Sequence, residues 1–190
     1  LGRRGLPILR DPATIDRADL LILESTYGDR LHPPLEDDVR AMEHIIAGTY
    51  KRGGNVIIPA FAVGRTQQVV YALHQLVAKG DLPNVPIYVD SPLAIDVTNT
   101  FRLHPECYDE ETLHFLTESR ARDPFGFESL IYTRTTEESK RLNFLTTPAV
   151  IISASGMAEA GRVLHHLKNN IENPKNTVLI VGFQAEHTLG

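Results

Sequence analysis

Residues 55–80, NVIIPAFAVGRTQQVVYALHQLVAKG, carry the pattern that decides the fold of this chain. The apolar run at residues 56–58 predicts a short buried strand. After a turn, valine and leucine side chains recur at the spacing of one helix face, and Gly80 then supplies a C-terminal stop signal. A strand that leads through a tight turn into an amphipathic helix is the repeating unit of α/β proteins.

The same unit recurs along the chain. Ser91 suits the N-cap of a helix and Pro92 its first position. Further strands are expected at residues 20–23, 87–89, 150–153 and 178–181. Further helices are expected at residues 36–52 and 110–118, after Pro92, after Thr135, and along a stripe of Val163, Leu164, Leu167 and Ile171. The sequence therefore predicts an α/β fold, with a mainly parallel sheet flanked by helices on both faces.

Composition narrows the class of protein without naming a function. The chain has 190 residues, of which 42% are hydrophobic, and this suits one or two domains with a sizeable core. The single cysteine, Cys107, excludes an internal disulfide framework and fits a cytoplasmic location. No apolar run approaches the ~20 residues that span a bilayer, so no membrane partner is expected. The net charge of -5 argues against a basic surface that coats nucleic acid, although a local basic cleft stays open.

Four expected strand ends carry small or polar residues: ESTYG, PAFAVGR, DSPLA and SASGM. Small residues let a backbone approach a ligand closely, and a helix that starts there directs free N–H groups at an anion. Phosphate is the expected guest, with unpaired N–H groups around Ser153, Ser155 and Gly156 and with Arg65 as a forked donor. The alternative is that these residues are ordinary turn formers and that the serines satisfy the N–H groups of their own turn.

The eight histidines do not predict a metal site. None of them forms a histidine or cysteine cluster with ligand spacing. His165 and His166 are adjacent, so on a helix their side chains point about 100° apart and would not share one ion. The chain also lacks a P-loop, a G-x-G-x-x-G dinucleotide motif and a G-x-S-x-G nucleophile elbow.

Five stretches in order carry a more specific signal: LLILESTYGDRLH, GGNVIIPAFAVGRTQQ, PIYVDSPLA, VIISASGMAEAGRVLHHL and VLIVGFQAEHTLG. Together they resemble the β-CASP branch of the metallo-β-lactamase-fold nucleases, which includes the bacterial RNase J enzymes and the endonuclease subunit of the pre-mRNA cleavage machinery. The resemblance covers nearly the whole chain. It implies an RNA-processing hydrolase that cleaves phosphodiester bonds and takes single-stranded RNA as its partner.

The resemblance also implies roles for single residues. Glu24 matches the family's motif A acid, a catalytic residue that contacts a motif B histidine near the scissile phosphate. Tyr27 is a candidate for base stacking. The residues expected to contact RNA or its phosphates are Ser25, Thr26, Tyr27, Arg65, Ser91, Ser153, Ser155 and Gly156.

Two zinc ions are expected in the full-length protein, where they would activate a hydroxide for attack on the phosphodiester. The chain lacks an initiator methionine and is expected to be an excised segment. The family's metal ligands are expected before LGRRG and after HTLG, so we expect no metal site and no cofactor in residues 1–190. By itself the segment is expected to be inactive.

The resemblance predicts three parts. Residues 1–30 are expected to form the edge of a first metallo-β-lactamase segment, residues 31–175 the β-CASP domain, and residues 176–190 the start of the return segment. One alternative is an independent doubly wound phosphate- or nucleotide-binding domain. Another is an interaction or dimerisation module with a large exposed apolar patch. The choice between endonuclease and exonuclease, and whether the full-length protein is a homodimer, are left open.

Overall fold

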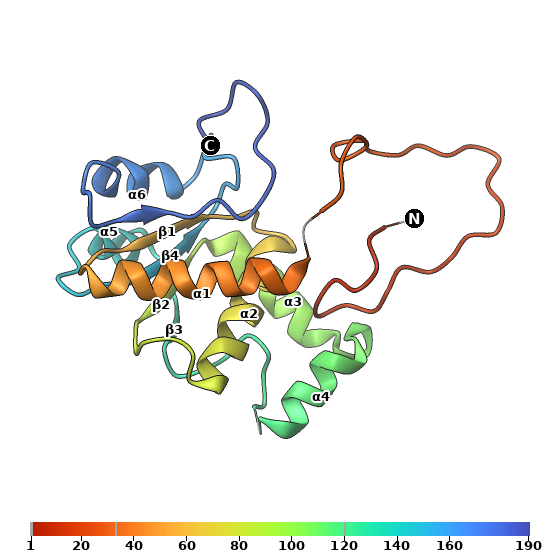
Figure 1. Cartoon of the computed structure of the whole chain (residues 1–190), viewed down its shortest axis with the longest axis horizontal. Helices are drawn as coiled ribbons and strands as arrows, with labels where there is room; N and C mark the ends of the chain where they lie inside the picture. The colour runs from red at the N-terminus through yellow and green to blue at the C-terminus, as the bar shows by residue number, and fades with distance from the viewer. Residues whose placement is uncertain (1, 33, 120) are drawn as a thin grey trace.

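The computed structural model describes residues 2–32, 34–119 and 121–190 (Figure 1). Within these residues, five parallel strands form one sheet in the order β3-β2-β4-β1-β5. The strands are β1 (Val56–Pro59), β2 (Ile87–Asp90), β3 (Leu130–Tyr132), β4 (Val150–Ser153) and β5 (Thr177–Val178). The helices are α1 (Leu35–Lys51), α2 (Arg65–Lys79), α3 (Pro92–Leu103), α4 (Glu110–Glu118), α5 (Thr136–Leu142) and α6 (Val163–Asn170), with a short 3-10 turn η1 (Pro105–Cys107).

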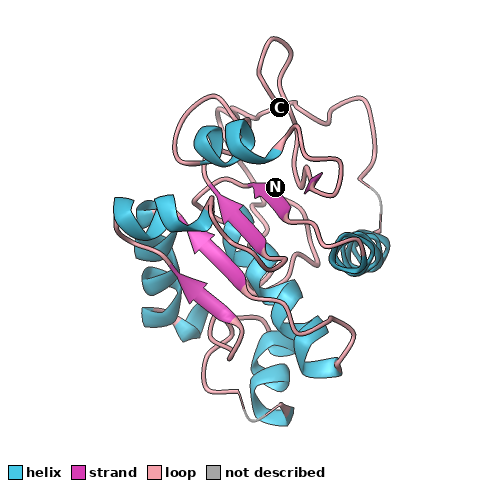
Figure 2. Ribbon diagram, turned by 90° about the vertical axis from the view of Figure 1, so that its left-hand side faces the viewer, coloured by secondary structure: helices cyan, strands magenta, loops and turns pink. Residues whose placement is uncertain are grey.

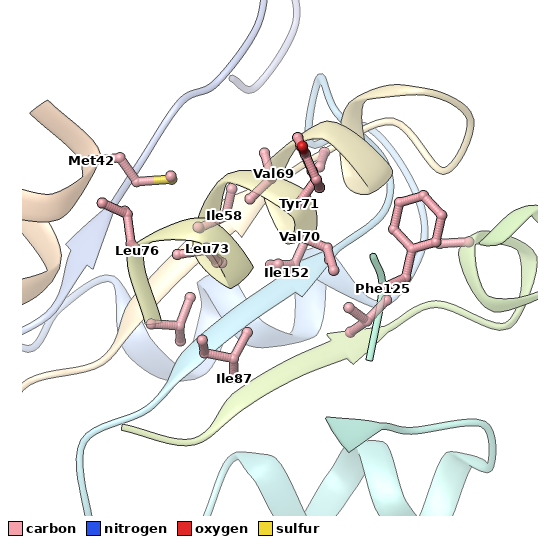
Figure 3. Close-up of a cluster of buried hydrophobic side chains, with 14 of the residues drawn as sticks. Met42, Ile58, Val69, Val70, Tyr71, Leu73, Leu76, Ile87, Phe125 and Ile152 are labelled. Carbon is pink, nitrogen blue, oxygen red and sulfur yellow. The ribbon is translucent and has the colours of Figure 1, made fainter. Parts of the chain in front are cut away.

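Helices cover both faces of the sheet, as Figure 2 shows. Successive residues of a strand point to opposite faces, so Ile58 and its neighbour Ile57 enter different cores. The larger core joins the Ile58 face to α1, α2 and α3, and Figure 3 shows its side chains. The smaller core joins the Ile57 face to α5 and α6. The predicted α/β fold, a parallel sheet flanked by helices on both faces, is confirmed.

The three central strands end level with one another. β4 pairs with β2 up to Asp90↔Ser153, and it pairs with β1 up to Pro59↔Ser153. All four residues of both β1 and β4 are buried. The register therefore places the polar residues Asp90 and Ser153 side by side at the carboxyl edge of the sheet.

Local signals in the sequence locate most elements correctly. The Oγ atom of Ser91 accepts a hydrogen bond from the Ala94 N–H (3.2 Å), as its predicted N-cap role requires. Thr135 caps α5 through a capping box with Glu138. The expected helix at residues 110–118 coincides with α4.

Two expected strands are wrong or shortened. Residues 20–23 form no strand, and their side chains are exposed. The last strand, β5, covers two residues instead of the expected run at 178–181. An apolar run becomes a buried strand where another strand and a helix cover it, and no such cover lies over residues 20–23 in the described part of the chain. Ile171 also departs from the expected buried stripe, because it follows the end of α6 and is exposed.

The segment before α1 forms a long loop that extends away from the sheet (Figure 1). Its described residues contain no helix, and it is anchored through Ile8, which is buried in the larger core. An isolated bridge joins Leu9 to Tyr108. No helix in the described part of the chain has both the length and the apolar character needed to cross a membrane. Exposed apolar side chains at residues 20–23 agree with the interaction-module alternative, which stays open.

Candidate functional site: a crevice at the carboxyl edge of the sheet

A crevice opens between the carboxyl ends of β2 and β4. β2 leads into α3 on one face of the sheet, whereas β4 leads towards α6 on the other face. Adjacent strands whose connections leave in opposite directions create a switch point, which is where open α/β sheets bind ligands. The crevice has a volume of about 380 Å³ and is lined by residues 90–93 and by parts of the loop 154–162.

Asp90 forms the floor of this crevice and is fully buried. One carboxylate oxygen, Oδ1, accepts hydrogen bonds from Thr133 Oγ1 (2.7 Å) and Arg162 Nη1 (2.7 Å). The other, Oδ2, accepts from Ser139 Oγ (2.5 Å) and contacts His166 Nε2 (2.7 Å). Burial by itself raises the pKa of this carboxyl, but the four hydrogen bonds outweigh burial and hold the pKa of Asp90 at about 2. The carboxylate is therefore charged at neutral pH.

Arg162 connects the carboxylate to the crevice wall. Besides Asp90, its guanidinium donates to the carbonyl oxygens of Thr133 (3.3 Å) and Arg134 (2.8 Å). Its side chain is 20% exposed and lines the crevice. These contacts engage both terminal nitrogens, Nη1 and Nη2, and hold the planar guanidinium in place at the crevice wall. The site thus combines a positive group with a rigid support.

The loop from Ala154 to Gly161 forms the opposite wall and satisfies several of its own donors. The Ser155 N–H donates to the Ala160 carbonyl (3.1 Å), and Ser155 Oγ accepts from the N–H groups of Glu159 (3.2 Å) and Ala160 (3.3 Å). Gly161 has φ +81°, and a Cβ atom there would lie 2.4 Å from the Ala154 carbonyl oxygen, so the fold of the loop requires glycine.

The expectation of unpaired N–H groups at this turn is therefore wrong for Ser155. The helix dipole expected behind SASGM is also displaced, because α6 begins at Val163, several residues beyond the turn. The physical reason is the one that the sequence left open: a serine hydroxyl accepts from the amides of its own turn.

The structure brings some of the predicted RNA-contacting residues together. Ser91 and Ser155 both line the crevice. Ser153 is buried beneath it, where its hydroxyl donates to the Asp90 carbonyl (2.9 Å). Gly156 is also buried and does not line the crevice. A Cβ atom there would lie 2.7 Å from the ring of Phe61. The binding roles of these residues stay predictions.

Arg65 lies at a second place on the same edge, at the start of α2. In the described residues its guanidinium has no ion pair or hydrogen bond. Gly182 lies close to it, since a Cβ atom there would be 3.9 Å from Arg65 Nε. Arg65 is therefore an available cation near the crevice rather than one of its walls.

Glu24, Ser25, Thr26 and Tyr27 lie in the N-terminal loop and do not line the crevice. The Thr26 N–H donates to Glu24 Oε2 (2.8 Å), and hydrogen bonding from Thr26 lowers the pKa of Glu24. The Tyr27 ring packs edge-on against Phe183, with centroids 5.9 Å apart. The catalytic role of Glu24 and the binding roles of its three neighbours stay predictions.

The sequence patterns assigned no role in a site to Asp90, Arg162 or His166. A usable signal existed for Asp90, which ends a buried apolar strand directly before an N-cap serine. Adjacent helix residues point about 100° apart, and accordingly His166 is buried at the crevice floor while His165 is exposed. The pair of adjacent histidines was therefore a second usable signal. No local pattern identifies Arg162, because its partners come from distant segments.

The described side chains do not fit a zinc site. Across residues 2–32, 34–119 and 121–190, no group of three or more His, Cys, Asp or Glu side chains could hold a metal ion. The nearest approach to such a set is Asp90 with His166, and both are already satisfied by Arg162, Ser139, Thr133 and Asn143. In the crevice lining the charged Asp90 carboxylate is paired with Arg162.

A parallel sheet covered by helices, with a crevice at its carboxyl edge, defines an open-sheet α/β protein. Residues 66–190 match the family model of the Beta-Casp domain, and the chain belongs to the β-CASP family. The chain is 40% identical over 191 residues to Ribonuclease TTHA0252 of Thermus thermophilus, covering 100% of this chain and 43% of the relative.

Two further relatives come from archaea. Transcription termination factor FttA of Methanosarcina mazei is 35% identical over 186 residues, which cover 96% of this chain and 29% of that protein. An RNase J-like protein of Methanocaldococcus jannaschii is 37% identical over 178 residues, which cover 93% of this chain and 40% of that protein. The chain thus spans less than half the length of these relatives, and the predicted domain boundaries stay predictions.

Proposed function

We propose that this chain is the RNA-binding part of a β-CASP ribonuclease and that its crevice holds a backbone phosphate of single-stranded RNA. One observation carries the proposal: the Arg162 guanidinium is fixed by a buried carboxylate at the wall of a crevice at the sheet's switch point. Such a guanidinium forms charge-assisted hydrogen bonds to phosphate without a large loss of side-chain entropy.

Two serine hydroxyls support the same ligand. Ser91 Oγ accepts from the Ala94 N–H, and Ser155 Oγ accepts from two N–H groups of its own loop. A hydroxyl can accept and donate at the same time, and neither serine donates to an acceptor among the described residues, so both protons are available to an anion. The crevice then offers donors from both walls to one phosphate.

In hydrolysis, the proposed task of this chain is to bind and orient the RNA strand. Glu24 is assigned the role of the motif A acid, next to a histidine that this chain does not supply. We place the two zinc ions expected in the full-length protein on residues outside this chain, and the roles proposed for the crevice do not involve them. A cytoplasmic location is part of the proposal and is supported by the single cysteine.

The test is a titration of a fluorescein-labelled ten-residue oligouridylate with the 190-residue chain at several salt concentrations. Arg162→Gln should weaken binding about tenfold, and the slope of log affinity against log salt should fall by ~0.7, the value for one phosphate contact on a single strand. Arg162→Lys keeps the charge and should keep most of the slope. Arg141→Gln removes an exposed arginine of α5 away from the crevice and should leave the affinity nearly unchanged.

Thermal unfolding of each variant shows whether the fold survives. A folded Arg162→Gln variant that binds with the wild-type affinity and salt slope would overturn the proposal. The same holds for a wild-type chain that binds no oligouridylate at low salt.

A further inference from the structure

Phe61 presents an exposed aromatic ring beside the crevice. It lies two residues after the end of β1, between two buried alanines, Ala60 and Ala62, yet 43% of its surface is exposed. A phenylalanine contributes most to stability when it is buried. An exposed ring near the end of a strand is therefore a candidate for binding a ligand when it lies beside a crevice.

The position of this ring is fixed. The Phe61 carbonyl accepts from the Thr66 N–H (3.1 Å) and from Thr66 Oγ1 (2.8 Å), so the first turn of α2 holds its backbone. The ring itself lies against Gly156, where a Cβ atom would come within 2.7 Å of it. The crevice loop therefore supports part of the ring, and the rest stays open to solvent.

Apolar side chains lie on two sides of the crevice. Leu93 lines the crevice together with Ser155 and is 60% exposed. Phe61 packs on Gly156, the residue that follows Ser155. A bare phosphate ion gains nothing from apolar neighbours, whereas a nucleotide presents an anionic phosphate and a flat apolar base within a few ångströms of each other.

We propose that Phe61 is a stacking platform for a nucleobase next to the phosphate held in the crevice. This inference rests on the proposed function and specifies its substrate: RNA whose bases are unstacked, because a ring at the rim cannot reach the face of a base inside a duplex. Stacking on an aromatic ring tolerates any base, so the platform selects single-stranded over paired RNA rather than one sequence over another.

The test compares two probes with equal numbers of phosphates, a ten-residue oligoadenylate and an abasic oligomer of the same length. Phe61→Ala should weaken binding of oligoadenylate about tenfold and should leave the abasic oligomer nearly unchanged. Phe61→Tyr keeps the ring and should bind like the wild type. Phe144→Ala is the matched control. This phenylalanine is 82% exposed and lies between α5 and β4, at the amino ends of the strands and opposite the crevice.

A second readout reports stacking directly. The chain contains no tryptophan, so the fluorescence of 2-aminopurine in the oligonucleotide can be followed without overlap. Binding to the wild type should quench the 2-aminopurine, and binding to a folded Phe61→Ala variant at saturation should quench it much less. A variant in which the ring had only supported the loop would lose affinity without this change in quenching.

The outcomes separate this inference from the proposed function. If the wild type binds both probes equally and Phe61→Ala changes neither, the phosphate crevice stands and the platform is overturned. Equal losses for both probes in Phe61→Ala would overturn it too, because the ring would then act through the shape of the loop. If the wild type binds neither probe, both proposals fail.

Discussion

Two pairs of arginine and aspartate side chains in this molecule have the same chemistry and nearly the same geometry. Arg162 approaches Asp90 at 2.7 Å, and Arg102 approaches Asp123 at 2.8 Å. Their surroundings differ, because the Asp90 side chain is fully buried whereas the Asp123 side chain is 29% exposed.

The buried pair joins more of the fold. Asp90 ends β2 and collects partners from the segment after β3, from α5 and from α6. Asp123 receives Arg102 from the end of α3 and the Phe125 N–H (2.9 Å) from its own loop. Removing one member of a buried pair leaves an uncompensated charge in a low dielectric. Where the remaining charge is partly exposed, water can replace the lost partner. Burial, rather than bond length, therefore sets how much an ion pair contributes to stability.

The largest expected effect comes from breaking the buried pair. Asp90→Ala leaves Arg162, Ser139, Thr133 and His166 without their shared acceptor and should lower the free energy of unfolding by about 3–5 kcal/mol. Urea denaturation followed by circular dichroism measures the change. Asp90→Asn keeps part of the hydrogen bonding and should lose less. A loss below about 1 kcal/mol for Asp90→Ala would mean that the burial of this carboxylate has been overstated.

Lowering the pH should break the same ion pair without a mutation. The pKa of Asp90 is about 2 in the folded protein, against an ordinary value of 3.8, so the folded state binds this proton less readily than the unfolded state. The resulting stabilisation, on the order of 2 kcal/mol, is fully present above pH ~4 and disappears as the pH falls towards 2.

Urea denaturation at pH 5, 4, 3 and 2.5 tests this prediction. The difference in stability between the wild type and Asp90→Asn should shrink over that range, since asparagine does not titrate there. A difference that stays constant down to pH 2.5 would contradict the lowered pKa.

Sequence patterns predict contacts between residues that are close together in the chain better than contacts between residues that are far apart in it. The caps at Ser91 and Thr135 were predictable, because each involves residues three positions apart. Strands β1, β2 and β4 were predictable because short apolar runs bounded by turns carry their own signal. Residues 20–23 carry the same signal and form no strand, since pairing depends on what lies beside them.

The crevice shows the other limit. Ser91 and Ser155 were predicted from their turns, and the structure places both on its walls. Asp90 finds His166 76 positions further along the chain and Arg162 72 positions further along. Only the order of the strands brings such residues together, and local patterns do not contain that order.

Smaller effects are expected from the partly exposed pair of Arg102 and Asp123. Asp123→Ala removes the ion pair with Arg102, but the guanidinium keeps its hydrogen bond to the Phe125 carbonyl (2.8 Å) and its position over the Tyr132 ring, 5.3 Å from the centroid. These remaining contacts and the access of water should limit the loss to about 1 kcal/mol. Asp96→Ala, which breaks the more exposed pair with Arg134, sets the lower reference and should cost even less. Urea denaturation in 0.1 M and 1 M salt measures both, and salt should reduce the two losses because exposed charges are screened. If Asp123→Ala were as costly as Asp90→Ala, burial would not be what separates the two pairs, and the loop that holds Asp123 would have to be counted among the structural supports of β3.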